Sequence, residues 1–184
     1  AADNQLPDVI TFAGNGEPTM HPDFEGVIAD TIALRDKYAP TAKISVLSNA
    51  TQLHREDVVR ALERVDNNIL KIDSLDEEMA RLINKPCCNY SVAKVVEQLK
   101  AFNGKVIVQT MFLRGQYEGR VVDNTTEEQV VAWLEAVKAI APESVMVYSI
   151  ARDTPCKSLA KVEREELEKI AERVRALGIS CSVA

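Results

Sequence analysis

The sequence contains few of the residues that most often build metal sites and disulfide frameworks. Its 184 residues include two histidines and four cysteines, which are Cys87, Cys88, Cys156 and Cys181. None of these forms a C-x-x-C pair, and the vicinal Cys87 and Cys88 cannot present thiolates with the spread that a metal cluster needs. Scattered cysteines in a cytosolic chain usually stay reduced and structural. The sequence therefore predicts no metal ligands in this chain.

Long apolar runs and an excess of positive charge are also missing. No stretch is long enough to span a bilayer, and the first residues, 1–7, lack the basic and apolar regions of a signal peptide. We therefore expect a cytoplasmic protein without a membrane partner. The formal net charge of −6 argues against strong, sequence-independent binding of nucleic acid, which depends on Lys and Arg neutralising phosphates.

Short apolar runs alternate with longer amphipathic ones along the chain. The strand-like runs cover residues 8–13, 43–48, 68–73, 105–113 and 144–150, with a short further run at 179–183. Helical spacing of apolar residues fills the intervals between them. Strands separated by helices imply parallel βαβ units, so we expect an α/β fold in a single domain over residues 1–184. A partial barrel and a doubly wound sheet both fit, and both bind ligands at the carboxyl ends of strands.

A glycine-containing loop follows the first predicted strand. Its residues are Gly14, Asn15, Gly16, Glu17 and Pro18. Glycine lets a backbone approach a ligand closely, so the amides and carbonyls of such a loop can hold a carboxylate or an ammonium group. A Gly-x-Gly pair is by itself equally typical of an ordinary βα turn, and the longer string is the more specific signal.

Polar residues also close the next two predicted strands. Ser48 and Asn49 end the second strand and fit either a ligand site or a plain polar turn. Lys71 and Asp73 stand two residues apart near the end of the third strand, so they share a face. A charged pair at the end of an apolar strand is costly unless it meets a partner or a ligand. The alternative is a solvated salt bridge at the rim.

The fourth and fifth predicted strands add two further pairs. Gln109 and Met111 share one face of an otherwise apolar strand, and a buried amide needs partners, which a neighbouring strand or a ligand can supply. Tyr148 and Ile150 share a face at the end of the following strand. They are either ordinary core residues or an apolar wall for a ligand.

Several of these segments resemble motifs of the radical S-adenosylmethionine (radical SAM) enzymes. Residues 14–19 resemble the GGEP motif, with Asn15 in place of a glycine. Residues 48–50 resemble the T-N-G segment, with Ala50 where glycine is common, and residues 83–86 resemble an I-N-x-P pattern. The resemblance covers nearly the whole chain and implies a partial (β/α)6 radical SAM barrel that lacks its first βα unit. It points to iron–sulfur oxidoreductases related to glycyl-radical-activating enzymes and wyosine-type synthases.

The resemblance also implies a cofactor, S-adenosylmethionine, and a role for each strand end. In that family the GGEP backbone binds the amino group of the methionine part, and the next strand presents its polar end, here Ser48 and Asn49, to the cofactor. The strand that carries Lys71 and Asp73 would serve the ribose and the carboxylate. Gln109 and Met111 would lie near the cofactor, and the last apolar pair would pack against adenine.

Radical SAM chemistry would be reductive cleavage of S-adenosylmethionine, which starts hydrogen abstraction from a substrate. It needs a [4Fe–4S] cluster on three cysteines spaced C-x3-C-x2-C, and thiolates are the ligands such clusters use. Only 13 residues precede Gly14 and none is cysteine. We therefore expect a truncated core with no catalytic side chain of its own, inactive as it stands, and the cluster in the full-length protein only.

The expected partners follow from the same resemblance. They are S-adenosylmethionine, an electron donor such as flavodoxin or ferredoxin, and a substrate, for which the acidic composition favours a glycyl radical enzyme over a tRNA base. Two other functions stay open. One is a non-radical (β/α)-barrel lyase, in which Lys71 and Asp73 would be the catalytic candidates. The other is a non-catalytic binding module.

Overall fold

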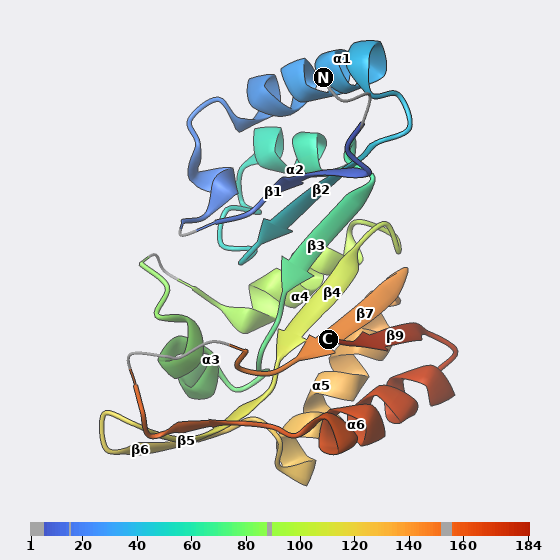
Figure 1. Cartoon of the computed structure of the whole chain (residues 1–184). Coiled ribbons are helices and arrows are strands. Elements are labelled where there is room, and N and C mark those ends of the chain that lie inside the picture. The colour runs from blue at the N-terminus through green and yellow to red at the C-terminus, as the bar shows by residue number, and fades with distance from the viewer. Residues whose placement is uncertain (1–5, 15, 88–89, 152–155) are drawn as a thin grey trace. The chain divides into compact units, whose positions relative to one another are not determined.

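The computed structural model describes residues 6–14, 16–87, 90–151 and 156–184. The chain divides into two compact units, of which unit 1 runs to Leu70 and unit 2 begins at Lys71. Each unit combines parallel strands with flanking helices (Figure 1). The predicted α/β class is therefore confirmed.

Unit 1 is built on parallel strands. β1 (Val9–Phe12) pairs with β2 (Lys43–Ser48), and β2 pairs with β3 (Asn67–Lys71), whose last residue begins unit 2. The 3₁₀ helix η1 (Pro18–Met20), α1 (Phe24–Tyr38) and α2 (Glu56–Leu62) connect the strands. In Figure 1, α1 and α2 lie on the same side of β1 and β2. Ile44 and Val46 of β2 are fully buried, so this strand forms the centre of the core of unit 1.

Unit 2 repeats the pattern with more helices. β4 (Ile107–Met111) pairs in parallel with β7 (Ser144–Tyr148), and β7 pairs in parallel with β9 (Ser180–Val183). The helices are α3 (Glu77–Asn84), α4 (Val92–Lys100), α5 (Glu127–Ile140) and α6 (Arg164–Ala176). Thr126 caps α5, because its side chain accepts a hydrogen bond from Gln129 N. No helix of the described residues is long and apolar enough to cross a membrane.

The two faces of β4 have different environments. Thr110 lies on the face covered by α5, where its Oγ1 accepts a hydrogen bond from Trp133 Nε1 at 2.9 Å. The Trp133 ring also meets Phe112 edge to face, with the ring centroids 5.3 Å apart. Gln109 and Met111 alternate with these buried residues and are only half-buried. The predicted pairing of Gln109 with Met111 on one face is thus confirmed.

The predicted strand over residues 105–113 is too long. β4 ends at Met111, and β5 (Leu113–Tyr117) starts a separate antiparallel sheet with β6 (Arg120–Asp123) and β8 (Leu159–Lys161). The physical reason is Asn124, whose Oδ1 accepts from Leu113 N at 2.8 Å and whose Nδ2 donates to Met111 O at 2.8 Å. This side chain supplies partners on both sides of the break in place of a neighbouring strand.

Gly115 lets β8 lie against β5. Its φ is +138°, and a Cβ at this position would stand 2.1 Å from Ser158 O. The turn between β5 and β6 has positive φ at both Glu118 and Gly119, as in the two-residue hairpin turns that match strand twist. Gly115 therefore allows β8 to pair with β5, and Gly119 allows the tight turn between β5 and β6.

Candidate functional site

In unit 1, Glu17 is the organising residue of the loop that follows β1. Its Oε1 accepts hydrogen bonds from Thr19 N at 3.1 Å and from Thr19 Oγ1 at 2.5 Å. Its Oε2 accepts from Asn49 N at 2.7 Å. One carboxylate therefore joins the loop after β1 to the turn after β2, while Pro18 opens η1. Glu17 positions backbone here, because both of its oxygens already have partners.

The turn after β2 is closed by its own side chains. Ser48 Oγ accepts a hydrogen bond from Ala50 N at 3.1 Å, and Asn49 Oδ1 accepts from Thr51 N at 3.0 Å. Ala50 has a φ of +62°, the left-handed conformation in which glycine costs least. This explains why glycine is common at this place in the motif that residues 48–50 resemble. Ser48 is buried and Asn49 is half-buried.

The two glycines of the loop have similar surroundings but different backbone conformations. A Cβ added to Gly14 or Gly16 would meet nothing within 4 Å. Gly14 has a φ of +156°, whereas the φ of Gly16 lies outside the range that excludes side chains. Asn15 lies outside the described residues. A side chain would therefore fit at Gly16 among the described residues, so neither crowding nor backbone conformation requires a glycine at this position.

In unit 2, the predicted Lys71 and Asp73 pair forms and is buried. Lys71 Nζ lies 2.9 Å from Asp73 Oδ2, as an ion pair rather than a well-aligned hydrogen bond, and donates to Asn84 Oδ1 at 3.0 Å. The Asp73 side chain is fully buried, and its Oδ1 accepts from Met111 N at 2.8 Å. The alternative of a solvated rim salt bridge is therefore wrong. Asn84 ends α3, and its only sequence signal was the I-N-x-P pattern.

Burial and charge act in opposite directions on Lys71. Burial is the largest single influence and would lower the pKa of its ammonium, but Asp73 and Tyr148 together outweigh it, and the pKa of Lys71 lies above the ordinary 10.5. Burial likewise raises the pKa of Tyr148 above the ordinary 10.0, against the opposing charge of Lys71. At neutral pH the site therefore holds a fixed ammonium next to a neutral phenol.

Asn124 is a site residue that the sequence did not reveal. It is 2% exposed, and besides holding the break after β4 its Nδ2 donates to the backbone carbonyl of Asp73 at 2.7 Å. It thus fixes the end of the segment that carries Lys71 and Asp73 against the end of β4. In the sequence, Asn124 stands in a polar run over residues 123–126 ahead of α5, and such a run is typical of a helix N-terminus.

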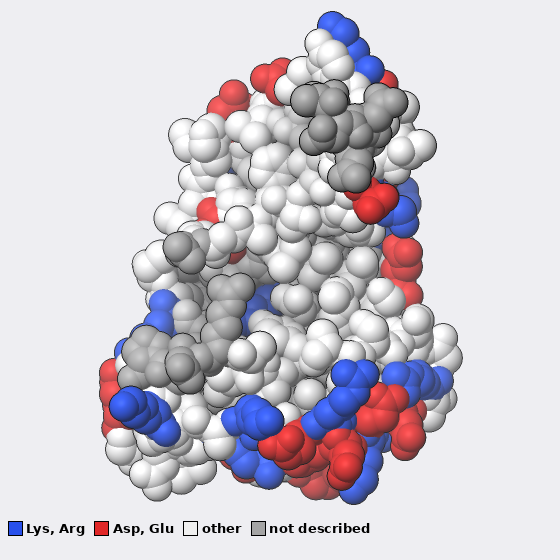
Figure 2. Space-filling view, viewed as in Figure 1, with Lys and Arg blue, Asp and Glu red and all other residues white. Residues whose placement is uncertain are grey.

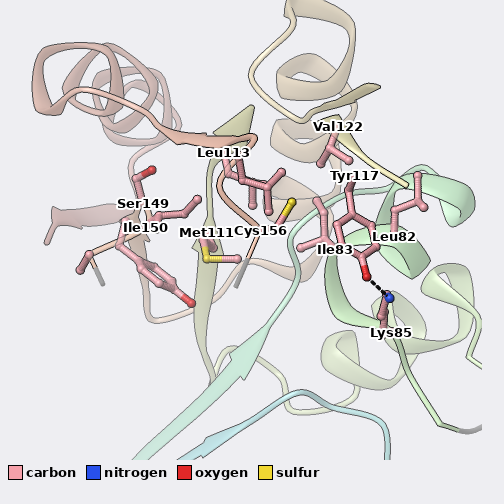
Figure 3. A pocket seen from close by; sticks show the side chains of 13 residues that line it. Leu82, Ile83, Lys85, Met111, Leu113, Tyr117, Val122, Ser149, Ile150 and Cys156 are labelled. Atoms are coloured by element: carbon pink, nitrogen blue, oxygen red, sulfur yellow. Dashed lines mark hydrogen bonds between the residues drawn. The ribbon is translucent and has the colours of Figure 1, made fainter. Parts of the chain in front are cut away.

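A pocket of about 600 Å³ opens beside this cluster, entirely within unit 2 (Figure 3). Three predicted residues line it: Met111, Tyr148 and Ile150. Most of the remaining lining is apolar and comes from α3, β5, β6 and β8, namely Leu82, Ile83, Leu113, Val122 and Leu159. Its size and character suit a small molecule. Met111 and Tyr148 join the pocket to the polar pair, Met111 through its backbone N–H and Tyr148 through its charge coupling.

The described cysteines do not form a cluster site. Among the residues that the structure describes, no three His, Cys, Asp or Glu side chains come together to hold a metal ion. Cys87 is exposed, Cys156 lines the pocket, and Cys181 is buried in β9, where burial raises its thiol pKa to about 11. A [4Fe–4S] cluster needs convergent thiolates, and these side chains do not fit one.

The charged surface of unit 2 is mixed in sign on the face that Figure 2 shows over α6. Arg173 pairs with Glu127 at 2.9 Å, and Arg175 pairs with Glu168 at 2.6 Å. That face therefore lacks the one-signed basic field that guides nucleic acid.

Comparison of the sequence with known proteins finds curated relatives but no matching family model. The UPF0026 protein of Methanocaldococcus jannaschii is 29% identical over 171 residues, covering 91% of this chain and 49% of that protein. The UPF0026 protein of Synechocystis sp. is 29% identical over 153 residues, covering 80% and 52%. GTPase Obg of Brachyspira hyodysenteriae is 24% identical over 184 residues, covering 98% of this chain and 25% of that protein. The chain thus spans about half the length of the UPF0026 relatives.

Solved structures with a similar fold include a radical SAM methyltransferase. A radical SAM methyltransferase from Sphaerobacter thermophilus has a TM-score of 0.72 at 13% identity, covering 100% of this chain and 52% of that one. A domain of pyruvate-formate lyase-activating enzyme from Bacteroides vulgatus has a TM-score of 0.67 at 17% identity, covering 95% and 98%. Streptococcus suis SuiB bound to S-adenosylmethionine has a TM-score of 0.68 at 15% identity, covering 96% and 39%. The chain therefore shares the α/β fold of these proteins, which confirms the predicted fold class.

Glu17→Ala should lower the free energy of unfolding of unit 1 by about 2 kcal/mol, because hydrogen bonds to a charged acceptor are lost and Thr19 is fully buried. Urea unfolding followed by circular dichroism measures it. The matched control is Glu63→Ala, an exposed glutamate of the same unit, which should change stability by less than about 0.5 kcal/mol. Equal losses in the two variants would contradict the role given to Glu17.

Lys71→Met should cost about 3 kcal/mol at pH 7, because the buried Asp73 carboxylate loses its counter-charge. Adding Asp73→Asn should recover part of that loss. Since the pKa of Lys71 is raised, its contribution is complete below pH 10.5 and declines as the pH rises through the folded-state value. Urea unfolding at neutral and strongly alkaline pH measures both effects.

The control for Lys71 is Lys161→Met, because the Lys161 side chain is 62% exposed and pairs with Glu163 at the surface. It should cost less than about 0.5 kcal/mol. A similar loss in both lysine variants, or a Lys71 contribution that persists at strongly alkaline pH, would be evidence against the ion pair.

Proposed function

We propose that this chain is the S-adenosylmethionine-binding core of a radical SAM enzyme. The observation that carries the proposal is the junction in unit 2, where a buried Lys71–Asp73 pair meets an apolar pocket through Met111 and Tyr148. S-adenosylmethionine joins a charged amino acid to a flat apolar base, so it needs a charged site and an apolar site side by side. The shared fold with radical SAM proteins supports this reading.

Lys71 is the residue that would meet the methionine carboxylate. An ammonium carries three donors, and in the described part of the chain Asn84 accepts one of them while Asp73 supplies the counter-charge at 2.9 Å. Asp73 is buried and paired through both oxygens, so it would position Lys71 rather than touch the ligand. Tyr148 and Ile150 would form the wall for adenine.

The remaining predicted contacts extend the proposal. Gln109 shares the half-buried face of β4 with Met111, and both would lie near the cofactor. The motif resemblance implies that the backbone of loop 14–18 would bind its amino group and that Ser48 and Asn49 would face the cofactor. When bound, S-adenosylmethionine supplies the chemistry by reductive cleavage, which starts hydrogen abstraction from a substrate. The protein's part is to bind and orient the cofactor and to exclude water.

The chemistry of Lys71 favours this function over a lyase. A catalytic lysine that acts as a base or forms a Schiff base must lose its proton near neutral pH, which usually requires a lowered pKa. Here Asp73 raises the pKa of Lys71, so the ammonium persists. Such a group suits the fixed binding of a carboxylate.

We further propose that the cluster cysteines lie on a segment outside these 184 residues, because the described cysteines do not fit a cluster. A C-x3-C-x2-C motif within about 50 residues upstream of Ala1 in the same gene, roughly one βα unit, is the expected result. Sequencing the gene checks it. A complete gene without the motif would favour a non-catalytic binding module instead.

A protein or peptide substrate, such as a glycyl radical enzyme, and an electron donor such as flavodoxin or ferredoxin complete the proposal. A pyruvate-formate lyase-activating enzyme domain and SuiB bound to its precursor peptide SuiA are among the proteins with this fold, which supports a polypeptide substrate. The mixed-sign surface over α6 lends no support to a tRNA substrate.

Binding of S-adenosylmethionine to the isolated chain tests the proposal, with saturation-transfer NMR as a readout for weak affinity. Lys71→Met should weaken S-adenosylmethionine about tenfold, the worth of one charge-assisted hydrogen bond, and leave 5′-methylthioadenosine unchanged. Gly16→Val should also weaken S-adenosylmethionine, because the added side chain meets open space in the chain but would meet a ligand held by the loop.

Lys161→Met is the control lysine and should bind like wild type. Circular dichroism confirms that each variant is folded. If Lys71→Met fails to fold, Gly16→Val still decides whether the loop contributes. Unchanged S-adenosylmethionine affinity in folded Lys71→Met and Gly16→Val would overturn the site.

A further inference from the structure

The pocket extends beyond the wall that Tyr148 and Ile150 would give to adenine. Its other walls come from elements outside the βα repeat: the end of α3, the β5–β6 hairpin and β8 (Figures 1 and 3). In Figure 3, Leu82, Ile83, Val122 and Tyr117 gather on one side of the pocket, across from Ser149 and Ile150. We call these four residues the hairpin wall. Ile83 and Leu82 are only half-buried, so apolar surface remains available there.

We propose that the hairpin wall binds an uncharged ring or branched aliphatic group of the substrate, next to the cofactor. This assignment deepens the proposed function and rests on it. The pocket lies at the carboxyl ends of β4 and β7, where α/β folds bind ligands, and the last residues of these strands, Met111 and Tyr148, line it. At about 600 Å³, the pocket exceeds what a single adenine ring needs.

The polar atoms of the lining explain why the bound group would be uncharged. Lys85 Nζ donates to Tyr117 Oη and to Glu118 Oε1, the latter at 2.9 Å, so its charge is balanced at the pocket edge. Ser149 Oγ donates to Phe112 O at 2.6 Å and accepts from Val162 N at 2.7 Å. These groups already have partners, and a charged ligand would lose its hydration without gaining a counter-ion.

Two surface ion pairs link α3 to the β5–β6 hairpin. Lys85 at the end of α3 pairs with Glu118 in the hairpin turn at 2.9 Å, and Glu78 at the start of α3 pairs with Arg120 of β6 at 2.7 Å. Exposed pairs of this kind add little stability. Both ends of α3 nevertheless contact the hairpin that contributes Tyr117 and Val122 to the wall.

Cys156 provides a built-in reporter for occupancy of the pocket. It lines the pocket, and Figure 3 draws its side chain among the other lining residues. Cys87 is exposed and lies outside the lining, so it serves as the internal reference. Alkylation of the wild-type chain by iodoacetamide, read at each cysteine by mass spectrometry, therefore measures whether a small molecule covers the pocket.

The probe is indole, and uracil is the polar planar control. For an indole Kd of about 1 mM, ~5 mM indole should slow alkylation of Cys156 about sixfold and leave Cys87 unchanged. Uracil at the same concentration should have no effect. Ile83→Gln should at least halve the protection by indole, because it places an amide in the hairpin wall. Val131→Gln, on exposed Val131 of α5, should keep it.

Alkylation of Cys156 that is insensitive to indole, or equally slowed by uracil, would overturn the proposal. So would equal losses of protection in Ile83→Gln and Val131→Gln. If Ile83→Gln fails to fold by circular dichroism, the wild-type comparison of indole with uracil still decides. Because S-adenosylmethionine binding is measured separately, protection by indole without that binding would refute the proposed function alone. Binding of S-adenosylmethionine without protection by indole would refute the hairpin wall alone.

Discussion

The buried carboxylate of Asp73 is the constraint on which the site of unit 2 depends. A fully buried carboxylate is costly unless charge and hydrogen bonds compensate it. Here Lys71 supplies the charge and Met111 N supplies a hydrogen bond at 2.8 Å. Each partner is thereby fixed: the ammonium is held at the strand end, and the end of β4 is held against it. The interaction that compensates the buried carboxylate therefore also fixes the position of the ammonium to which the proposed function assigns a carboxylate ligand.

Asn124 links the buried Asp73 segment to the strands that form the pocket. By bonding the carbonyls of Asp73 and Met111 and the N–H of Leu113, it ends β4 and turns the chain into β5. Without that turn, the chain would continue along the parallel sheet and no hairpin would rise beside α3. The antiparallel sheet that results needs Gly115, because β8 approaches its backbone too closely for a side chain. The break after β4 and the pairing of β5 with β8 thus depend on one buried amide and one glycine.

The sequence predicts the parts of this structure that follow from local pattern. The α/β class, the strand over 43–48 and the shared face of Lys71 and Asp73 all follow from periodicity, which depends on near neighbours. The end of β4 could not be predicted in this way, because residues 105–113 form one mostly apolar run without a turn signal, and the break is imposed by Asn124, more than ten residues away in sequence. The walls of the pocket come partly from β5, β6 and β8, so the pocket could not be predicted without these strands.

The raised pKa of Lys71 suits a chain that binds its proposed cofactor and takes no part in proton transfer. A site that performs acid–base chemistry keeps a group poised to change its protonation near neutral pH. Asp73 does the reverse, because it stabilises the ammonium, and burial keeps the Tyr148 phenol neutral. The protonation states of Lys71 and Tyr148 are therefore constant over the physiological range. A constant field suits a protein that holds a reactive cofactor and an apolar substrate group in place, since reactivity that resides in the cofactor needs orientation and dryness rather than proton exchange with the protein.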